Sequence, residues 1–229
     1  MGGRFYQLIS ETYCRSKCTT KCGNRRTKFF DYNRGVRRGC NLSPLLFNLY
    51  LNDIPFLLDN SCDTDSIILS NGLPLNCLCY ADDLFLISRS ASGLQKQIDV
   101  LQNYVETWLL KINRHKTKVV ISQKQNRKAT WEKYSFFLNG NQIVNTPKYT
   151  YLGTTFNSNG SCATSKKNLV EKSRSSVFAC KRYIEFNKLS VSKCNFLFHA
   201  LFAPVLLHSS EVWGAYDSLI PKKMGERSH

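Results

Sequence analysis

Apolar side chains near the amino terminus recur every three or four residues, a spacing that predicts a helix. The positions are Phe5, Leu8, Ile9 and Tyr13. The next stretch, T-T-K-C-G-N-R-R-T-K-F-F, has one short strand-like segment on each side of Gly23-Asn24, and this arrangement predicts a hairpin. The chain therefore opens with a helix followed by two short strands.

A second helix is predicted from the segment N-L-S-P-L-L-F-N-L-Y-L-N-D-I-P. Ser43 is placed to cap its amino end and Pro44 to occupy its first turn. The helix should run for about three turns and end near Pro55, where a polar loop follows.

The segment I-I-L-S-N-G-L-P-L-N-C-L-C-Y predicts a strand, a turn at Asn71-Gly72 and a second strand. After Asp82-Asp83 a further strand continues from Leu84 to Ser88. The two aspartates therefore fall at the tip of a strand, turn and strand.

Residues 92–110 carry apolar positions at helical spacing and predict an amphipathic helix that covers one face of the sheet. Residues 118–122 read as a strand, 123–133 as a basic polar linker, and 136–156 as short strands divided at Asn139-Gly140 and Pro147. From Lys166 to about Leu219 the spacing is helical again. The pattern predicts an α+β fold with an antiparallel sheet, helices on one of its faces, and a helical region at the end.

Charge indicates the partner. The 229 residues contain 32 Lys and Arg against 16 Asp and Glu, a formal net charge of +16, which favours binding to nucleic acid. The most apolar segment, residues 196–207, is interrupted by His199 and is too short to span a bilayer.

The amino terminus lacks the apolar stretch of a secretory signal, so we expect an intracellular protein. In a reducing compartment its cysteines should be free thiols. The spacing of Cys14, Cys18 and Cys22 leaves a zinc site as a less favoured alternative.

Asp82 and Asp83 are the candidate metal ligands. Adjacent carboxylates at a tight turn repel each other, and a divalent cation relieves that repulsion. The alternative is an ordinary hydrophilic turn, because aspartate favours turns for its own backbone hydrogen bonds.

The order of motifs distinguishes these readings. G-V-R-R-G-C-N-L-S-P comes first, then Y-A-D-D, I-N-R-H-K-T-K and K-Y-T-Y-L-G. In this order they resemble the reverse transcriptases of non-LTR (LINE-type) retrotransposons, over nearly the whole chain. The resemblance implies an RNA-directed DNA polymerase that uses two Mg²⁺ or Mn²⁺ ions, an RNA template and a DNA primer, and it implies a nuclear location.

By this resemblance Asp82 and Asp83 bind the metal ions, and the residues that contact nucleotide or template are Gly35, Arg37, Arg38, Gly39, Ser43, Pro44 and Tyr80. The family's usual first motif is G-V-R-Q-G-C-P-L-S-P, so this chain departs from it at Arg38 and Asn41. Arginine at position 38 loses the amide acceptor of glutamine and adds a charge beside a triphosphate.

The resemblance also implies that Lys116 lies near the triphosphate and donates a proton to pyrophosphate. Its alternative is a solvated surface lysine. The turn Tyr151, Leu152 and Gly153 resembles the primer grip, which holds the primer terminus, although Tyr149 beside it reads equally well as a core aromatic residue.

The implied domains are a partial polymerase palm at residues 1–122, a linker with primer-grip strands at 123–160, and a helical thumb-like region at 161–229. In the family a further catalytic aspartate precedes the first helix of this chain, in an upstream segment that also includes the fingers. Of the acidic residues upstream of the hairpin, Glu11, Asp31 and Asp53 are candidates for this role, and none sits in a suitable apolar strand. We therefore expect this chain alone not to extend a primer. The alternative function is a catalytically inactive fragment or retroelement relic that binds RNA or RNA–DNA hybrid.

Overall fold

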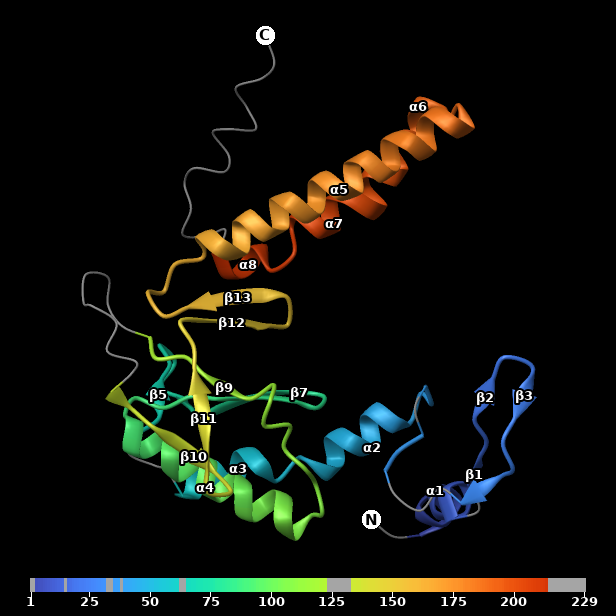
Figure 1. Ribbon diagram of the computed structural model, residues 1–229. Coiled ribbons are helices and arrows are strands. Elements are labelled where there is room, and N and C mark those ends of the chain that lie inside the picture. Colours follow the sequence, from blue (N-terminus) through green and yellow to red (C-terminus); the bar gives the residue numbers. More distant parts are fainter. Residues whose placement is uncertain are drawn as a thin grey trace. The chain divides into compact units, whose positions relative to one another are not determined.

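The computed structural model describes residues 3–14, 16–31, 35–37, 39–61, 65–122 and 133–213 (Figure 1). The chain forms two compact units, Met1–Val100 and Leu101–His229. Each unit is described by itself.

The first unit opens with helix α1 (Arg4–Cys14), as the apolar spacing predicted. Two antiparallel ladders follow, one between β1 (Lys17–Cys18) and β4 (Phe30–Asp31) and the other between β2 (Lys21–Cys22) and β3 (Arg25–Arg26). Gly23 in the turn between β2 and β3 has a φ of +59°, a conformation that glycine adopts without a steric penalty. The predicted hairpin at Gly23-Asn24 is confirmed.

The second predicted helix is divided in two. Helix α2 (Ser43–Tyr50) ends before the expected stop, and helix α3 (Ile54–Ser61) begins where a loop was predicted. Pro55 was read as a helix terminator, but it occupies the first turn of α3, where its missing N–H has no intrahelical partner to lose. Ile54 and Leu58 on α3 are buried at 4% and 1% exposure, and this burial stabilises the helix that the sequence reading missed.

Two antiparallel pairs follow α3. Strand β5 (Ile67–Ile68) pairs with β6 (Pro74–Leu75) across the predicted Asn71-Gly72 turn. Strand β7 (Cys77–Tyr80) pairs with β8 (Asp83–Leu86). Helix α4 (Ala91–Thr107) comes next and places Gln97 and Ile98 in the core of this unit.

The second unit has a core built from the end of α4 and a three-stranded sheet. The sheet has the order β10 (Phe136–Leu138), β11 (Asn141–Asn145), β9 (Lys118–Val119). The pair β9–β11 is parallel, which the alternation of residues did not predict. The buried apolar side chains of this core are Tyr104, Val105, Val119, Phe136, Leu138 and Ile143. Strand β9 is shorter than the predicted residues 118–122, and α4 ends at Thr107 because Leu109 adopts a left-handed conformation.

Strands β12 (Lys148–Tyr151) and β13 (Thr154–Asn157) form the next hairpin, in full antiparallel register. Helix α5 (Ala163–Asn187) packs on β13. The chain then turns back through α6 (Val191–Leu197), the π-helical turn η2 (Phe198–Phe202), α7 (Ala203–Leu206) and α8 (Ser210–Trp213). Figure 1 shows α7 running alongside α5. Pro204, which has no N–H, lies in the first turn of α7, two residues after the end of η2, and explains the local change of helix type.

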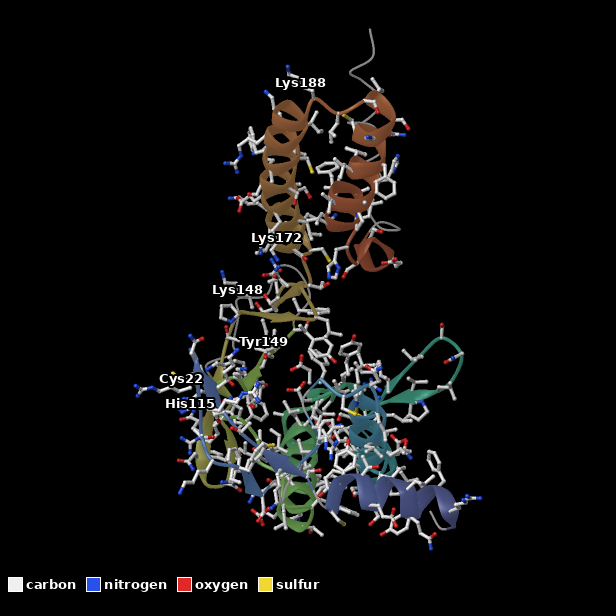
Figure 2. The ribbon with its side chains drawn as sticks, turned by 90° about the vertical axis from the view of Figure 1, so that its right-hand side faces the viewer. Cys22, His115, Lys148, Tyr149, Lys172 and Lys188 are labelled. Carbon is white, nitrogen blue, oxygen red and sulfur yellow. The ribbon has the colours of Figure 1, made fainter. Side chains whose placement is uncertain are left out.

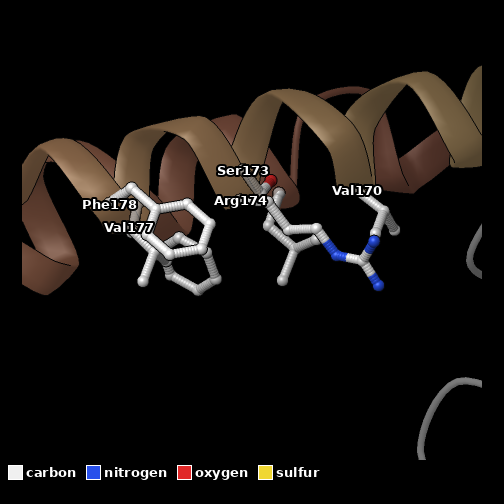
Figure 3. Close-up of a pocket in the computed structure, with 7 residues that line it drawn as sticks. Val170, Ser173, Arg174, Val177 and Phe178 are labelled. Carbon is white, nitrogen blue, oxygen red and sulfur yellow. The ribbon is translucent and has the colours of Figure 1, made fainter.

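Helix α5 and the returning helices line an open, apolar pocket of about 300 Å³ (Figure 3). It is lined by Val170, Ser173, Arg174, Val177, Phe178, Phe202 and Leu206. In Figure 3 the Arg174 guanidinium extends away from the ring of Phe178. The predicted helical character is confirmed up to residue 213; residues 123–132 of the predicted linker and residues 214–229 lie outside the described residues.

The described residues thus combine helices with small, mainly antiparallel sheets, an α+β fold. In these residues the strands form one three-stranded and five two-stranded sheets rather than a single larger sheet.

Candidate functional site

The hairpin β7–β8 carries both candidate metal ligands at its tip. Tyr80 pairs with Asp83, and Ala81-Asp82 forms the two-residue turn between them. Ala81 has a φ of +51°, a left-handed conformation that costs a residue with a Cβ roughly 1–2 kcal/mol. Asp82 and Asp83 are both exposed. The sharp turn beside the aspartates that the sequence required is therefore present.

Two cysteines lie on one face of β7, because alternate residues of a strand share a face. Cys77 and Cys79 pair with Leu86 and Leu84 on β8, whereas Tyr80 and Asp83 lie on the opposite face. The Cys77 thiol donates a hydrogen bond that lowers the pKa of Cys79 to about 7, against the effect of burial. The same interaction, burial and the nearby Asp59 raise the pKa of Cys77. The lowered pKa favours the thiolate of Cys79, on the face away from Asp83.

Buried amides fix the base of this hairpin. Asn76, 3% exposed, donates its side-chain N–H to Asp59 Oδ1 on α3 at 2.7 Å, and its backbone carbonyl accepts the Ile87 N–H at 2.7 Å. Gln97 on α4, fully buried, donates to the Ile87 carbonyl at 2.9 Å. These bonds tie the hairpin to two helices, so its exposed tip stands on a rigid base.

The loop before α2 contains two glycines in left-handed conformations, Gly35 at φ +82° and Gly39 at φ +81°. A Cβ built on Gly39 would meet no atom within 4 Å, so the backbone there is open to approach. Between them, the Arg37 guanidinium faces α1. It donates to the Thr12 carbonyl and to Ser16 Oγ, the latter from Nε at 3.0 Å, and lies 5.4 Å from the Tyr13 ring centroid. Arg38 lies outside the described residues.

Ser43 does not cap α2, so the prediction of a Ser43 cap was wrong. Leu42 is the residue that precedes α2, and no side chain caps the helix there. Ser43, 5% exposed, instead donates its hydroxyl to the Arg37 carbonyl at 2.6 Å. Since its proton is used in that bond, the Tyr13 hydroxyl donates to Ser43 Oγ at 3.2 Å. Pro44 occupies the first turn of α2 as predicted.

Cys40 lies between Gly39 and the start of α2. The backbone N–H of Leu42 is the main cause that lowers the pKa of its thiol, with smaller contributions from Ser43 and Tyr13. Free N–H groups at the start of a helix favour an anion. The loop thus has an open backbone and donors that suit a negatively charged group.

Arg37 should be important for stability. Arg37→Ala removes a charged donor with several partners between the loop and α1, so we expect it to lower the free energy of unfolding by about 2 kcal/mol. Urea denaturation followed by circular dichroism measures this. Arg25→Ala, an exposed arginine on β3, is the matched control and should change the free energy little. Equal effects of the two substitutions would contradict this role of Arg37.

The second unit contains a basic pocket of about 560 Å³ between β9, β11, the β12–β13 hairpin and the start of α5. Its basic lining residues are His115, Lys116, Lys118 and Lys148, and hydroxyl and amide side chains, including Thr164 and Asn168 of α5, complete it. No carboxylate is among its described lining residues. In Figure 2, Lys148 and Tyr149 lie between His115 and the part of α5 that carries Lys172. This composition suits phosphate groups.

Lys116 and the predicted primer-grip hairpin are joined in this pocket. Tyr149 donates its hydroxyl to the Lys116 carbonyl at 3.2 Å. Tyr149 is half-buried and Lys116 is exposed, so the lysine side chain reaches solvent at the pocket. The turn at Leu152-Gly153 has φ values of +47° and +83°, and Leu152 is 43% exposed.

Carboxylate oxygens are the ligands that Mg²⁺ prefers, so Asp82 and Asp83 fit such an ion. Over the described parts of the chain, no group of three or more His, Cys, Asp or Glu side chains comes together to hold a metal. Two carboxylates would fill only part of the coordination shell of such an ion.

Comparison with known proteins decides the family. A family model described as reverse transcriptase (RNA-dependent DNA polymerase) matches residues 5–156. The chain belongs to the reverse transcriptase family. The predicted resemblance to the enzymes of non-LTR retrotransposons is confirmed.

Its relatives are polymerases and polyproteins of mobile elements. The RNA-directed DNA polymerase from mobile element jockey of Drosophila melanogaster is 27% identical over 188 residues, which is 79% of this chain and 19% of the relative. The Pol polyprotein from the type-2 retrotransposable element R2DM of the same species is 30% identical over 132 residues, or 56% of this chain and 12% of the relative. The Pol polyprotein from the type-1 element R2 of Nasonia vitripennis is 27% identical over 158 residues, or 66% and 15%. The chain spans at most 19% of the length of these three relatives.

Reverse transcriptases generally use divalent metal ions and bind a nucleic-acid template and primer, which agrees with the predicted cofactor and partners in this coarse form. Among the helices of the described residues, none has the length and apolar character needed to cross a membrane.

Several residues that build these sites in the reverse transcriptase chain were not predicted from the sequence. Asn76 and Gln97 read as ordinary polar residues, yet both are buried under the hairpin. Lys118 and Lys148 were not distinguished from other basic residues, although Lys118 lies two positions after Lys116. His208 contacts the Leu152 carbonyl, 56 residues away in the sequence, and no local pattern signals that contact.

Proposed function

We propose that this chain forms part of the palm and thumb of an RNA-directed DNA polymerase, which adds nucleotides to a DNA primer along an RNA template. In this proposal residues 1–122 are the partial palm, 123–160 the linker and primer-grip strands, and 161–229 the thumb-like region. The observation that carries it is the exposed Asp82-Asp83 pair on a tight, anchored hairpin inside the segment matched by the family model.

Asp82 and Asp83 hold the divalent ions in this proposal. When bound, two Mg²⁺ or Mn²⁺ ions activate the primer 3′-hydroxyl and stabilise the charge on the leaving pyrophosphate. The hairpin presents both carboxylates to solvent on a fixed base, so they need not reorganise to bind.

The loop at residues 35–44 contacts the nucleotide and template. Gly35 and Gly39 both adopt left-handed conformations, Gly39 leaves the backbone accessible, and the start of α2 at Ser43-Pro44 favours phosphate. Arg37 supports this loop from the α1 side, with its guanidinium on Thr12 and Ser16. Arg38 and Tyr80 complete the nucleotide and template contacts in this proposal.

The basic pocket binds the phosphodiester backbone of the RNA–DNA hybrid. Lys116 lies toward the triphosphate, and Lys118 and Lys148 neutralise backbone phosphates. The turn Tyr151, Leu152 and Gly153 holds the primer terminus, since a neighbouring aromatic face suits sugar and base.

Primer extension tests this function. The 188 residues similar to the jockey polymerase replace the corresponding segment of that polymerase, and the hybrid protein receives a DNA primer on an RNA template, Mg²⁺ and four deoxynucleotides. We expect RNA-templated extension of the primer. A hybrid protein that binds the RNA–DNA duplex but adds no nucleotide would contradict the proposal and favour a segment that binds nucleic acid without catalysis.

A further inference from the structure

The turn between β12 and β13 adopts an unusual conformation for its sequence. Leu152 and Gly153 both have positive φ values, +47° and +83°, as in the two-residue turns that suit the twist of a hairpin. Asparagine or glycine usually occupies the first of these positions, because other residues pay a steric penalty there. Leu152 has no polar side chain to offset that penalty, so contacts from elsewhere must hold the turn.

Those contacts come from the segment between α7 and α8. His208 Nε2 lies 3.1 Å from the Leu152 carbonyl oxygen, and since that oxygen can only accept, Nε2 carries the proton in this contact. The Thr154 hydroxyl donates to Ser209 Oγ at 2.8 Å. Two consecutive residues therefore bind the two sides of the turn.

Gly153 permits this approach. A Cβ at position 153 would lie 2.7 Å from His208 Nε2, closer than such atoms approach in folded proteins. The imidazole thus rests against the glycine α-carbon, and any larger residue would displace it.

The start of α5 holds the same hairpin from another direction. The Thr155 N–H donates to Ser165 Oγ at 3.3 Å in a buried contact, and Thr155 is 5% exposed. Helix α7 in turn packs against α5. The hairpin is therefore bound both where the helical region begins and where it returns.

We propose that His208 is a positioning residue for polymerisation, which couples the helical region to the turn that holds the primer terminus. This inference rests on the proposed function, because it takes residues 151–153 as the primer grip. His208 acts through the Leu152 carbonyl and touches no substrate. A shift of the helical region would pass through His208 to the turn and alter where the primer 3′ end lies.

The first experiment tests the contact in the free protein. Hydrogen exchange of residues 149–157 is compared in the unmutated chain, His208→Ala and His208→Gln. Loss of the contact should speed exchange in the turn by about 5-fold in His208→Ala, because one hydrogen bond no longer opposes opening. His208→Gln, which keeps a side-chain donor, should exchange nearly as slowly as the unmutated chain. Unchanged exchange in His208→Ala would overturn the coupling whatever the function of the chain.

The second experiment tests the effect on the primer. Affinity is measured for an RNA–DNA hybrid with a recessed primer 3′ end and for one with both ends closed by hairpin loops. We expect His208→Ala to lower the preference for the recessed end by about 10-fold, since small misplacements at a reacting terminus have large effects, and to leave the closed hybrid unaffected. His208→Gln should restore the preference. His199→Ala, an exposed histidine on η2, is the matched control and should change neither value.

The outcomes separate the two proposals. An unmutated chain with no preference for the recessed end would refute the primer-grip assignment, and with it the inference, even if the exchange result is as expected. A normal preference that His208→Ala leaves intact would overturn the inference alone and leave the proposed function standing.

Discussion

Asp82→Asn/Asp83→Asn should lower primer extension by at least about 10³-fold in the hybrid protein, the jockey polymerase that carries the similar 188 residues of this chain. The reason is that metal-bound charge stabilisation contributes several kcal/mol to the transition state. Asparagine keeps the size and the turn preference of aspartate but has no negative charge with which to bind a divalent ion. The fold of the β7–β8 hairpin should therefore survive. Single-turnover extension rates at a saturating concentration of the RNA–DNA substrate measure the chemical defect.

A second double variant removes the same charge elsewhere. Asp31→Asn/Asp53→Asn changes two exposed aspartates of the first unit by the same net charge and should leave the extension rate within about 2-fold of the unmutated value. Affinity for the hybrid should be retained or slightly raised in both variants, since each loses negative charge. Extension that persists in Asp82→Asn/Asp83→Asn would show that these residues are an ordinary polar turn.

Substitution of the pocket lysines should have the second-largest effect. Lys116→Ala/Lys118→Ala/Lys148→Ala removes three positive charges that line one pocket, so affinity for an RNA–DNA hybrid should fall about 10- to 100-fold at low salt. The slope of log affinity against log salt concentration should become shallower by about 3, one for each lost phosphate contact. Fluorescence anisotropy of residues 1–229 over a range of NaCl concentrations measures both quantities.

Charge alone must be separated from position. Lys96→Ala/Lys111→Ala/Lys133→Ala removes three exposed lysines that do not line the pocket, with the same change of net charge. Its salt slope should change by less than about 1. If the two triple variants lose affinity and slope equally, the binding is due to the overall charge of +16 and the pocket has no special part in it.

Elements that depend on neighbouring residues were predictable. The hairpin tip at Asp82-Asp83 followed from apolar strands on either side of a polar pair, and α4 followed from its apolar spacing. Both patterns report contacts within a few residues of each other in the chain. The hairpin tip that carries the candidate metal ligands could therefore be predicted from the sequence.

Ser43 and Pro55 show where local rules compete. Ser43 has the side chain of a helix cap, but the Arg37 carbonyl, six residues earlier, captures its hydroxyl. Pro55 both ends helices and begins them, and burial of Ile54 and Leu58 decided for a beginning. A sequence lists the candidates for such contacts without showing which partner prevails.

Contacts between distant segments were not predictable. The parallel pairing of β9 with β11 brings Lys118 beside Val144, and the pocket that results also includes Asn168 of α5. The contact of His208 with Leu152 is of the same kind. Each depends on how helices and strands pack, for which single positions carry no periodic signal.

Localised cleavage by iron tests the central claim, that Asp82 and Asp83 hold divalent ions beside the primer. Residues 1–229 are bound to an RNA–DNA hybrid, Fe²⁺ replaces Mg²⁺, and ascorbate with peroxide produces hydroxyl radicals that cut the chain near the bound metal. The account predicts cuts centred on residues 80–84 that excess Mg²⁺ suppresses, that disappear in Asp82→Asn/Asp83→Asn and that persist in Asp31→Asn/Asp53→Asn. Cuts elsewhere, or cuts at the hairpin that survive the loss of both carboxylates, would contradict it.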